Sequence, residues 1–365
     1  MQQHGVQPNL SSFKAALMAW RQATKGTYSP FRAQRILEWM IQLYSDEKND
    51  SSFPDADCFD ICLQTWSRSG HPEAPQRAEA LLLSMERLYE RTQLERIQPR
   101  ATSFNAVLAA WARSGQEHSA ERAADILTFM ENLPDVSPDA ASYCTVLTAL
   151  SRSHPNPLAA ATKATVFLQH ALEHAKDSKN KVELDTILFN TAMGLWSKTN
   201  SPMAYQKASA ILQCQRELYF DGGYKSCRPD VYGFTSVLAS CASVPDSKAF
   251  GAAWQVAVNT YDQLREEGRA NHVSYATMLK SCGRLLSNDP KKRHAWARKV
   301  FGHAVTAGCV NTFVLKRLEL AVNGKTFREL LQGHSTSSLP EAWTAHSNDQ
   351  PRTKSYRERR RRAEV

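Results

Sequence analysis

Residues 99–139 read PRATSFNAVLAAWARSGQEHSAERAADILTFMENLPDVSPD and hold one full repeat of the pattern that decides the fold. Apolar side chains in this stretch recur with offsets of 0, 4 and 7 residues, and a polar break at Arg113-Ser114-Gly115 divides them into two sets. The two sets are Phe104, Leu108 and Trp111, then Ala123, Leu127 and Met130. Such offsets place side chains on one face of an α-helix. The stretch therefore predicts a helical hairpin in which each helix has one apolar face.

The same columns recur along most of the chain. The aromatic that opens each first helix is found at Phe13, Phe59, Phe104, Tyr143, Phe189, Phe234 and Tyr275. The second-helix set is found at Ala33, Leu37 and Met40, at Ala78, Leu82 and Met85, and more loosely at Ala164, Leu168 and Ala171, at Ala208 and Leu212, and at Ala297, Phe301 and Ala304. A lone hairpin cannot cover its own apolar faces, so the hairpins are expected to stack into an all-α solenoid with a continuous core.

The repeat columns divide the chain into predicted intervals. Seven helix-turn-helix repeats are expected at 10–55, 56–100, 101–139, 140–185, 186–230, 231–271 and 272–311, preceded by the tail of a truncated repeat at 1–9 and followed by capping helices at 312–343 and a basic disordered tail at 344–365. Strand-like alternation of apolar and polar residues is absent, which excludes sheet-based folds.

Composition narrows the class of protein. With 365 residues, 42% of them hydrophobic, the chain can bury a large core. It contains no run of 18 apolar residues, so no membrane-spanning helix is predicted. The eight cysteines form no C-x-x-C pair, which favours reduced thiols. The net charge of +9 favours an acidic partner, but +5 of it lies in residues 351–365 and only +4 in the other 350 residues. The repeats are therefore expected to be nearly neutral.

The repeat resembles the pentatricopeptide repeat. The resemblance rests on Ser103-Phe104-Asn105-Ala106-Val107-Leu108, on the Gly115 turn, on Met130 at the end of the second helix and on the closing Pro138-Asp139. A tetratricopeptide repeat would place its tryptophan and proline differently. The repeat units, measured between successive proline landmarks, are 39 to 46 residues long, which exceeds the usual unit length of the family. Several units also lack parts of the family's pattern.

The resemblance implies a right-handed superhelical solenoid that binds single-stranded RNA, roughly one base per repeat. In the family, a base is read by the residue after the opening aromatic together with the last residue of the unit. The pairs at the matching positions are Lys14 with Asp55, Asp60 with Arg100, Asn105 with Asp139, Cys144 with Asp185, Asn190 with Asp230, Thr235 with Asn271, and Ala276 with Asn311. By this resemblance, Asn105–Asp139 and Asn190–Asp230 would prefer U and Thr235–Asn271 would prefer A, giving 5′-U-x-U-A-3′; Cys144–Asp185 and Ala276–Asn311 are weaker candidates.

Other interpretations of these residues stay open. A terminal Asp can simply cap the next helix, whereas Asn105 has no evident packing reason to be Asn. Ile187 and Val273 are the candidate base-stacking residues, and Asp57 and Asp60 would repel a phosphate. A helical-repeat scaffold for protein partners within a ribonucleoprotein complex is the alternative function.

No enzyme, cofactor or metal site is predicted. His170-Ala171-Leu172-Glu173-His174 matches the zinc-hydrolase pattern H-x-x-E-H, but a third ligand is not evident and a helix surface explains it. Deaminase motifs and Gly-rich phosphate loops are absent.

The two ends complete the expectations. Residues 1–9 read as the end of a preceding repeat, so upstream repeats and a transit peptide are expected to be missing, and the resemblance implies a mitochondrion or a plastid. Arg357, Arg359, Arg360, Arg361 and Arg362 are candidate non-specific phosphate contacts. The expected partners are single-stranded RNA and other organellar RNA-processing proteins, with no membrane, for a monomeric protein.

Overall fold

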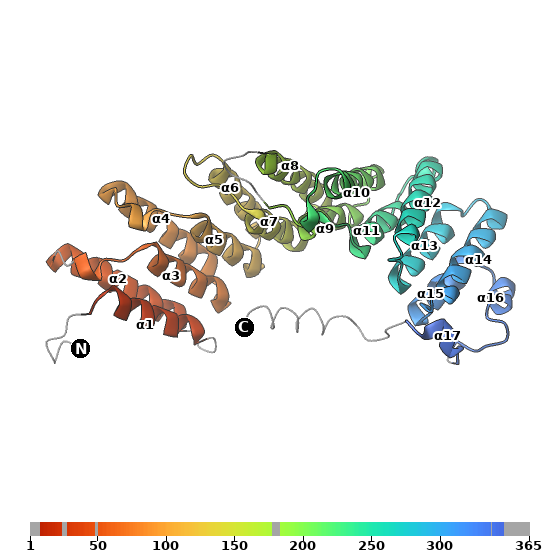
Figure 1. Cartoon of the computed structure of the whole chain (residues 1–365), viewed down its shortest axis with the longest axis horizontal. Helices are drawn as coiled ribbons and strands as arrows, with labels where there is room; N and C mark the ends of the chain where they lie inside the picture. The colour runs from red at the N-terminus through yellow and green to blue at the C-terminus, as the bar shows by residue number, and fades with distance from the viewer. Residues whose placement is uncertain (1–7, 24–27, 48–49, 177–182, 337, 347–365) are drawn as a thin grey trace. The chain divides into compact units, whose positions relative to one another are not determined.

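The protein was analysed as a computed structural model, which describes residues 8–23, 28–47, 50–176, 183–336 and 338–346 (Figure 1). Each predicted repeat interval contains two α-helices. The first helices are α1 (Leu10–Gln22), α3 (Ala56–Ser69), α5 (Ala101–Ser114), α7 (Ala140–Ser153), α9 (Thr186–Ser197), α11 (Val231–Ala242) and α13 (His272–Leu285). The second helices are α2 (Ser29–Glu47), α4 (Ala74–Thr92), α6 (Ser119–Glu131), α8 (Pro157–Lys176), α10 (Ala204–Phe220), α12 (Phe250–Glu266) and α14 (Pro290–Thr306).

Three shorter helices follow these repeats: α15 (Thr312–Ala321), α16 (Gly324–Leu330) and α17 (Glu341–Thr344). Single 3₁₀ turns lie at η2 (Asp50–Ser52), η3 (Glu95–Ile97), η4 (Lys225–Cys227) and η5 (Ser247–Ala249). The described residues form no β-strand, only one isolated bridge between Ser335 and Ser338. The predicted all-α class of stacked helix-turn-helix repeats is confirmed.

The sequence columns form the core. All seven aromatics that open the first helices are at most 4% exposed, and the alanines of the second-helix column are fully buried. Small side chains at these alanines let the paired helices approach closely. Two tryptophans of the first helices also have their indole N–H groups hydrogen-bonded: Trp66 Nε1 donates to Gln34 at 3.0 Å and Trp111 Nε1 donates to Glu79 at 3.0 Å. Each indole therefore ties a first helix to the second helix of the preceding repeat.

The chain divides into two compact units, residues 1–192 and 193–365, which we describe separately. In unit 1, α1, α3, α5 and α7 pack side by side, and α2, α4 and α6 each pack between two of these first helices (Figure 1). In unit 2, α11, α13 and α15 pack side by side in the same way, and α12 and α14 bridge them. The first helices of each unit, together with α15 in unit 2, form its first-helix layer, on which the predicted RNA site lies.

The end of unit 2 is closed by α17. The Trp343 ring meets the Phe301 ring edge-on at 5.8 Å, and the Val310 backbone N–H donates to the Trp343 carbonyl at 2.8 Å. Trp343 is 8% exposed, so this short helix covers apolar surface of α14. No helix within the described ranges is long and apolar enough to cross a membrane.

Candidate nucleic-acid interface

The aspartates at the ends of the predicted repeats cap the next first helix. Their carboxylates accept backbone N–H groups of the first turn: Asp55 from Cys58 at 3.2 Å, Asp139 from Ser142 at 2.8 Å, Asp185 from Leu188 at 2.9 Å, and Asp230 from Tyr232 at 3.0 Å and Gly233 at 3.1 Å. These contacts satisfy N–H groups that a helix leaves unpaired at its start. The capping interpretation is therefore confirmed at all four positions, and the presence of Asp alone does not indicate a base.

In unit 1, the two members of each predicted reading pair contact each other. Four contacts join a first helix to the residue that precedes the next one: Lys14 Nζ to Asp55 Oδ2 at 2.5 Å, Arg100 Nη2 to Asp60 Oδ2 at 2.7 Å, Asn105 Nδ2 to both Asp139 oxygens at 3.1 Å, and Cys144 Sγ to Asp185 Oδ1 at 3.8 Å. The residues lie far apart in the sequence, and the stacking of repeats brings them together. These contacts show that the members of each pair are neighbours, and base reading by them stays a prediction.

The first two of these pairs belong to a wider ionic network. Asp57 accepts from Lys14 Nζ at 2.9 Å and from Arg100 Nη2 at 2.7 Å, so it links the Lys14–Asp55 pair to the Asp60–Arg100 pair. The hydrogen bonds from Lys14 and Arg100 hold the pKa of the Asp57 carboxyl below its usual value. Every charged group of these two pairs is therefore already engaged by a group of opposite charge.

Asp60 is the buried anchor of this network. Its side chain is 8% exposed, and it also accepts hydroxyl hydrogen bonds from Thr102 at 2.7 Å and Ser103 at 2.5 Å. The network borders a surface hollow that is also lined by Met18 and Gln64. Lys14 and Arg100, which line the hollow, are thus paired with carboxylates, whereas Arg21 in the same lining donates to the neutral Gln64 amide at 3.0 Å.

Asn105 corrects one expectation from the sequence. The expectation was that packing gives no reason for Asn at this position. In the structure, Asn105 Nδ2 donates to Asp139, and Asn105 Oδ1 accepts from the Ser142 hydroxyl at 2.6 Å. The side chain therefore fastens α5 to the capped start of α7, and this structural role explains Asn105 without RNA.

The second predicted Asn–Asp pair is divided between the two units. Asn190 lies in α9 within unit 1 and is 9% exposed, while Asp230 caps α11 in unit 2. Base reading by this pair stays a prediction.

The predicted pairs of unit 2 differ in what they leave accessible. Asn271 caps α13 through its Oδ1, which accepts from Val273 N at 3.0 Å and Ser274 N at 3.1 Å, and no described group accepts from its amide nitrogen. The Thr235 hydroxyl donates to the Tyr232 carbonyl at 3.0 Å and keeps its acceptor capacity. The members of the weaker pair, Ala276 and Asn311, are only 0% and 6% exposed. Of the two, the Thr235–Asn271 pair has the polar groups within reach of a ligand.

A large apolar side chain is exposed at one of the two predicted stacking positions, Ile187, and at the corresponding position of α11, Tyr232. Ile187 in α9 is 54% exposed and Tyr232 in α11 is 58% exposed, whereas Val273 is half-buried. Exposed aromatic and aliphatic groups can pack on the face of an unpaired base. Tyr232, which the sequence analysis did not select, is thus a further candidate for stacking.

Three cations that the sequence analysis missed lie on neighbouring first helices of unit 2. Lys280 and Arg284 are four residues apart on one face of α13, and Arg317 lies on α15, which packs beside α13. At Gly283, α13 approaches α15 closely enough that an added Cβ would lie in ordinary van der Waals contact with Ala321 Cα, at 3.6 Å.

The three cations have no acidic partner among the described residues. The Arg284 guanidinium donates to the Val244 carbonyl at 3.1 and 3.3 Å, and the Arg317 guanidinium lies 5.5 Å from the Phe313 ring centre. Burial lowers the pKa of Lys280, and the charges of Arg317 and Arg284 lower it further. An anion bound at this place would relieve the mutual repulsion.

The charge of the repeats is unevenly distributed along the chain, although their net charge is small. Residues 272–331 contain eleven Lys or Arg and three acids, a net charge of +8, whereas residues 55–139 contain eight Lys or Arg and fourteen acids, a net charge of −6. The even balance of the whole repeat region is therefore the sum of an acidic part and a basic part. The lack of acids in 272–285 is the sequence signal that would have led to Lys280 and Arg284.

The H-x-x-E-H segment lies on α8 and has a packing role. His170 Nδ1 lies 3.0 Å from Glu131 Oε1, and the buried Tyr143 hydroxyl donates to the same oxygen at 3.0 Å. The His174 ring meets the Tyr143 ring edge-on at 6.4 Å. Across the described part of the chain, no group of three His, Cys, Asp or Glu side chains can hold a metal ion.

Several predicted features fall outside the described residues. They are the truncated repeat tail in residues 1–7 and, within the basic tail, Arg357 and Arg359 to Arg362. All eight cysteines are described, and none forms a disulfide. Cys58 and Cys62 are buried, as expected for structural thiols.

Comparison with known proteins gives a limited result. No family model matches the chain, and no curated protein matches it. Among solved structures, the chain is similar to the pentatricopeptide repeat protein PPR10 from maize, with 14% identity, a TM-score of 0.28 and coverage of 94% of this chain and 55% of that chain. A second similar structure is PPR10 in complex with an 18-nt psaJ RNA element, with 15% identity, a TM-score of 0.26 and coverage of 94% and 56%.

The chain thus spans about half the length of the PPR10 chain. TM-scores this low do not establish a shared arrangement of helices, so the fold class rests on the helices of this chain.

Proposed function

We propose that this protein binds single-stranded RNA along its first-helix layers and that unit 2 supplies the main phosphate contacts. The observation that carries the proposal is the set of Lys280, Arg284 and Arg317 on adjacent first helices, with no acidic partner among the described residues. Backbone phosphates are the natural ligands of such a set, because they are regularly spaced anions. The net charge of +8 in residues 272–331 supports binding at the same end of the chain.

Base recognition is proposed for a smaller set of repeats. Thr235 and Asn271 retain hydrogen-bonding capacity on the same layer as the cations, and the exposed Tyr232 ring offers a stacking surface next to them. A base edge can be read by such short polar groups. Asn105–Asp139 is proposed to read U and Thr235–Asn271 to read A, while reading of U at Asn190 and Asp230 follows from the family resemblance alone.

The first two repeats are proposed not to read bases. In both, the reading positions form ion pairs, Lys14 with Asp55 and Arg100 with Asp60, and a base would have to break these contacts to reach either side chain. We expect RNA to contact the chain from the third repeat onward.

Gel-shift measurements with defined RNAs test this proposal. An RNA containing U-x-U-A should bind more tightly than the same RNA with the final A changed to C. The Thr235→Ala variant should lose that preference by roughly 5- to 150-fold, as expected for loss of one base contact at about 1–3 kcal/mol. The matched control is Lys14→Met, which alters a pair proposed not to read bases and should leave the preference unchanged. Equal binding of both RNAs by the unaltered protein would overturn base reading.

The cellular role is a further part of the proposal. Processing, stabilisation or translation of a transcript in a mitochondrion or a plastid follows from the family resemblance, as do RNA-processing proteins as partners. Sequencing of RNA crosslinked to the protein in cells would identify both the transcript and its compartment. Recovery of nuclear-encoded cytosolic messages alone would overturn the organellar role.

A further inference from the structure

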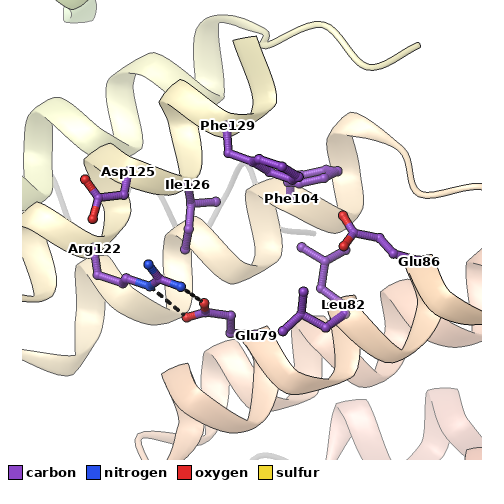
Figure 2. A pocket seen from close by; sticks show the side chains of 9 residues that line it. Glu79, Leu82, Glu86, Phe104, Arg122, Asp125, Ile126 and Phe129 are labelled. Atoms are coloured by element: carbon purple, nitrogen blue, oxygen red, sulfur yellow. Dashed lines mark hydrogen bonds and ion pairs between the residues drawn. The ribbon is translucent and has the colours of Figure 1, made fainter. Parts of the chain in front are cut away.

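A second surface of unit 1 has the features of a protein-binding groove. It lies between the second helices α4 and α6, and Figure 2 shows it with Phe104 and Phe129 at one end and the Glu79–Arg122 pair at the other. Its floor is made of Leu82, Ile126 and Phe104, which are 1% to 7% exposed. The groove belongs to the opposite helix layer from the proposed RNA site.

The groove exists because α4 and α6 both pack on α5 but make little contact with each other. Two large apolar side chains stand at its edges in solvent: Leu83 is 45% exposed and Phe129 is 50% exposed. The Phe129 ring lies 6.3 Å from the buried Phe104 ring, so it extends the core outward. Exposed apolar groups next to an apolar floor are typical of an interaction site.

The charged groups of the groove define what it can bind. Arg122 is paired with Glu79, which also accepts from Trp111 Nε1 at 3.0 Å. Glu86 is half-buried and has no hydrogen bond or ion pair with any described residue. Burial, and then the neighbouring Glu90, raise the pKa of the Glu86 carboxyl. The groove therefore offers an uncompensated carboxylate beside an apolar floor.

We propose that this groove binds a segment of a partner protein in which an apolar side chain is followed by Lys or Arg. The apolar side chain would lie between Leu83 and Phe129, and the cation would pair with Glu86. Charge complementarity selects this occupant: Asp125 adds a second carboxylate to the lining, and residues 55–139, which include α4 and α6, carry a net charge of −6. The same charge disfavours RNA at this surface.

The test uses a library of random peptides displayed on phage, selected against the full chain. Selected peptides should combine an aliphatic or aromatic residue with a Lys or Arg and should bind the Phe129→Ser variant at least tenfold more weakly than the unaltered protein. Glu86→Lys should weaken the same peptides at least tenfold. The matched control is Phe220→Ser in α10, which removes a phenylalanine that is 59% exposed elsewhere and should leave binding unchanged.

Three results would overturn the proposal. They are the recovery of no peptide that depends on Phe129, the recovery of peptides that lack a basic residue, and sedimentation showing a dimer of this chain that Phe129→Ser dissociates. Because Phe129 and Glu86 are not core residues, unchanged thermal unfolding of both variants would confirm that loss of binding is a surface effect. RNA affinity should be the same in Phe129→Ser, so failure of this proposal and failure of the RNA proposal can be told apart.

Discussion

Replacement of Gln215 by Met should stabilise the protein. Gln215 lies on α10, seven residues after the buried Ala208, in the position that Met40, Met85 and Met130 occupy in the first three repeats. Its side chain is 0% exposed, and neither amide atom has a hydrogen-bond partner among the described residues. Burial of an unpaired amide costs roughly 1–3 kcal/mol by mutational measurements.

The size of the effect follows from the two terms that change. Met has nearly the same volume as Gln, so the surrounding side chains need not move much, and the unpaired amide is removed. We expect the free energy of unfolding of unit 2 to rise by about 1–2 kcal/mol, which corresponds to an increase in melting temperature of about 2–8 °C for a unit of this size.

Thermal and urea unfolding followed by circular dichroism measure this difference. The control is Gln213→Met, two residues away on the exposed side of α10, which should change stability by less than about 0.5 kcal/mol. If Gln215→Met destabilises the protein, the amide is engaged in the folded state, and the reasoning from the repeat column fails at this position.

Two other predictions concern the interior of the protein. Asp60→Ala should destabilise the protein by about 2–4 kcal/mol, because it removes a buried carboxylate that accepts three short hydrogen bonds. The control Asp57→Ala, at a side chain that is 53% exposed, should cost less than about 1 kcal/mol. Equal losses of stability in urea unfolding would refute the role of Asp60 as a buried anchor. Burial raises the pKa of the Cys58, Cys241 and Cys282 thiols to about 12, so they should resist iodoacetamide at pH 8 until the protein unfolds. Because these pKa values are higher in the folded than in the unfolded state, the contribution of these thiols to stability should be fully present below pH 9 and be lost as the pH rises toward 12. Faster alkylation of folded than unfolded protein would contradict this prediction.

The helices were predictable because their signals are local. The spacing of apolar residues such as Phe104, Leu108 and Trp111 indicates which face of the helix is buried. Asp139 indicates where the next helix begins, because its side chain caps the first turn. These features depend on helix periodicity and on the first turn, which the sequence contains directly.

The site was less predictable because it depends on neighbours from other repeats. The contact of Asn105 with Ser142 and Asp139 arises only when α5 packs against α7, so the sequence could not distinguish a structural amide from a base reader. Lys280 and Arg317 are likewise brought together by the packing of α13 on α15. The groove beside Phe129 follows from the spacing of α4 and α6, which no residue pattern states.

The most direct test of RNA binding by unit 2 is the salt dependence of affinity, measured by fluorescence anisotropy with a labelled U-x-U-A RNA. The unaltered protein should bind steeply less well as salt rises, and the double variant Lys280→Gln, Arg317→Gln should bind more weakly with a log–log salt slope reduced by about 1.4, because two phosphate contacts at about 0.7 each are lost. The control Lys291→Gln, an exposed lysine on the second helix α14, should keep the slope of the unaltered protein. An unaltered protein whose RNA affinity does not respond to salt, or a double variant with an unchanged slope, would contradict the account.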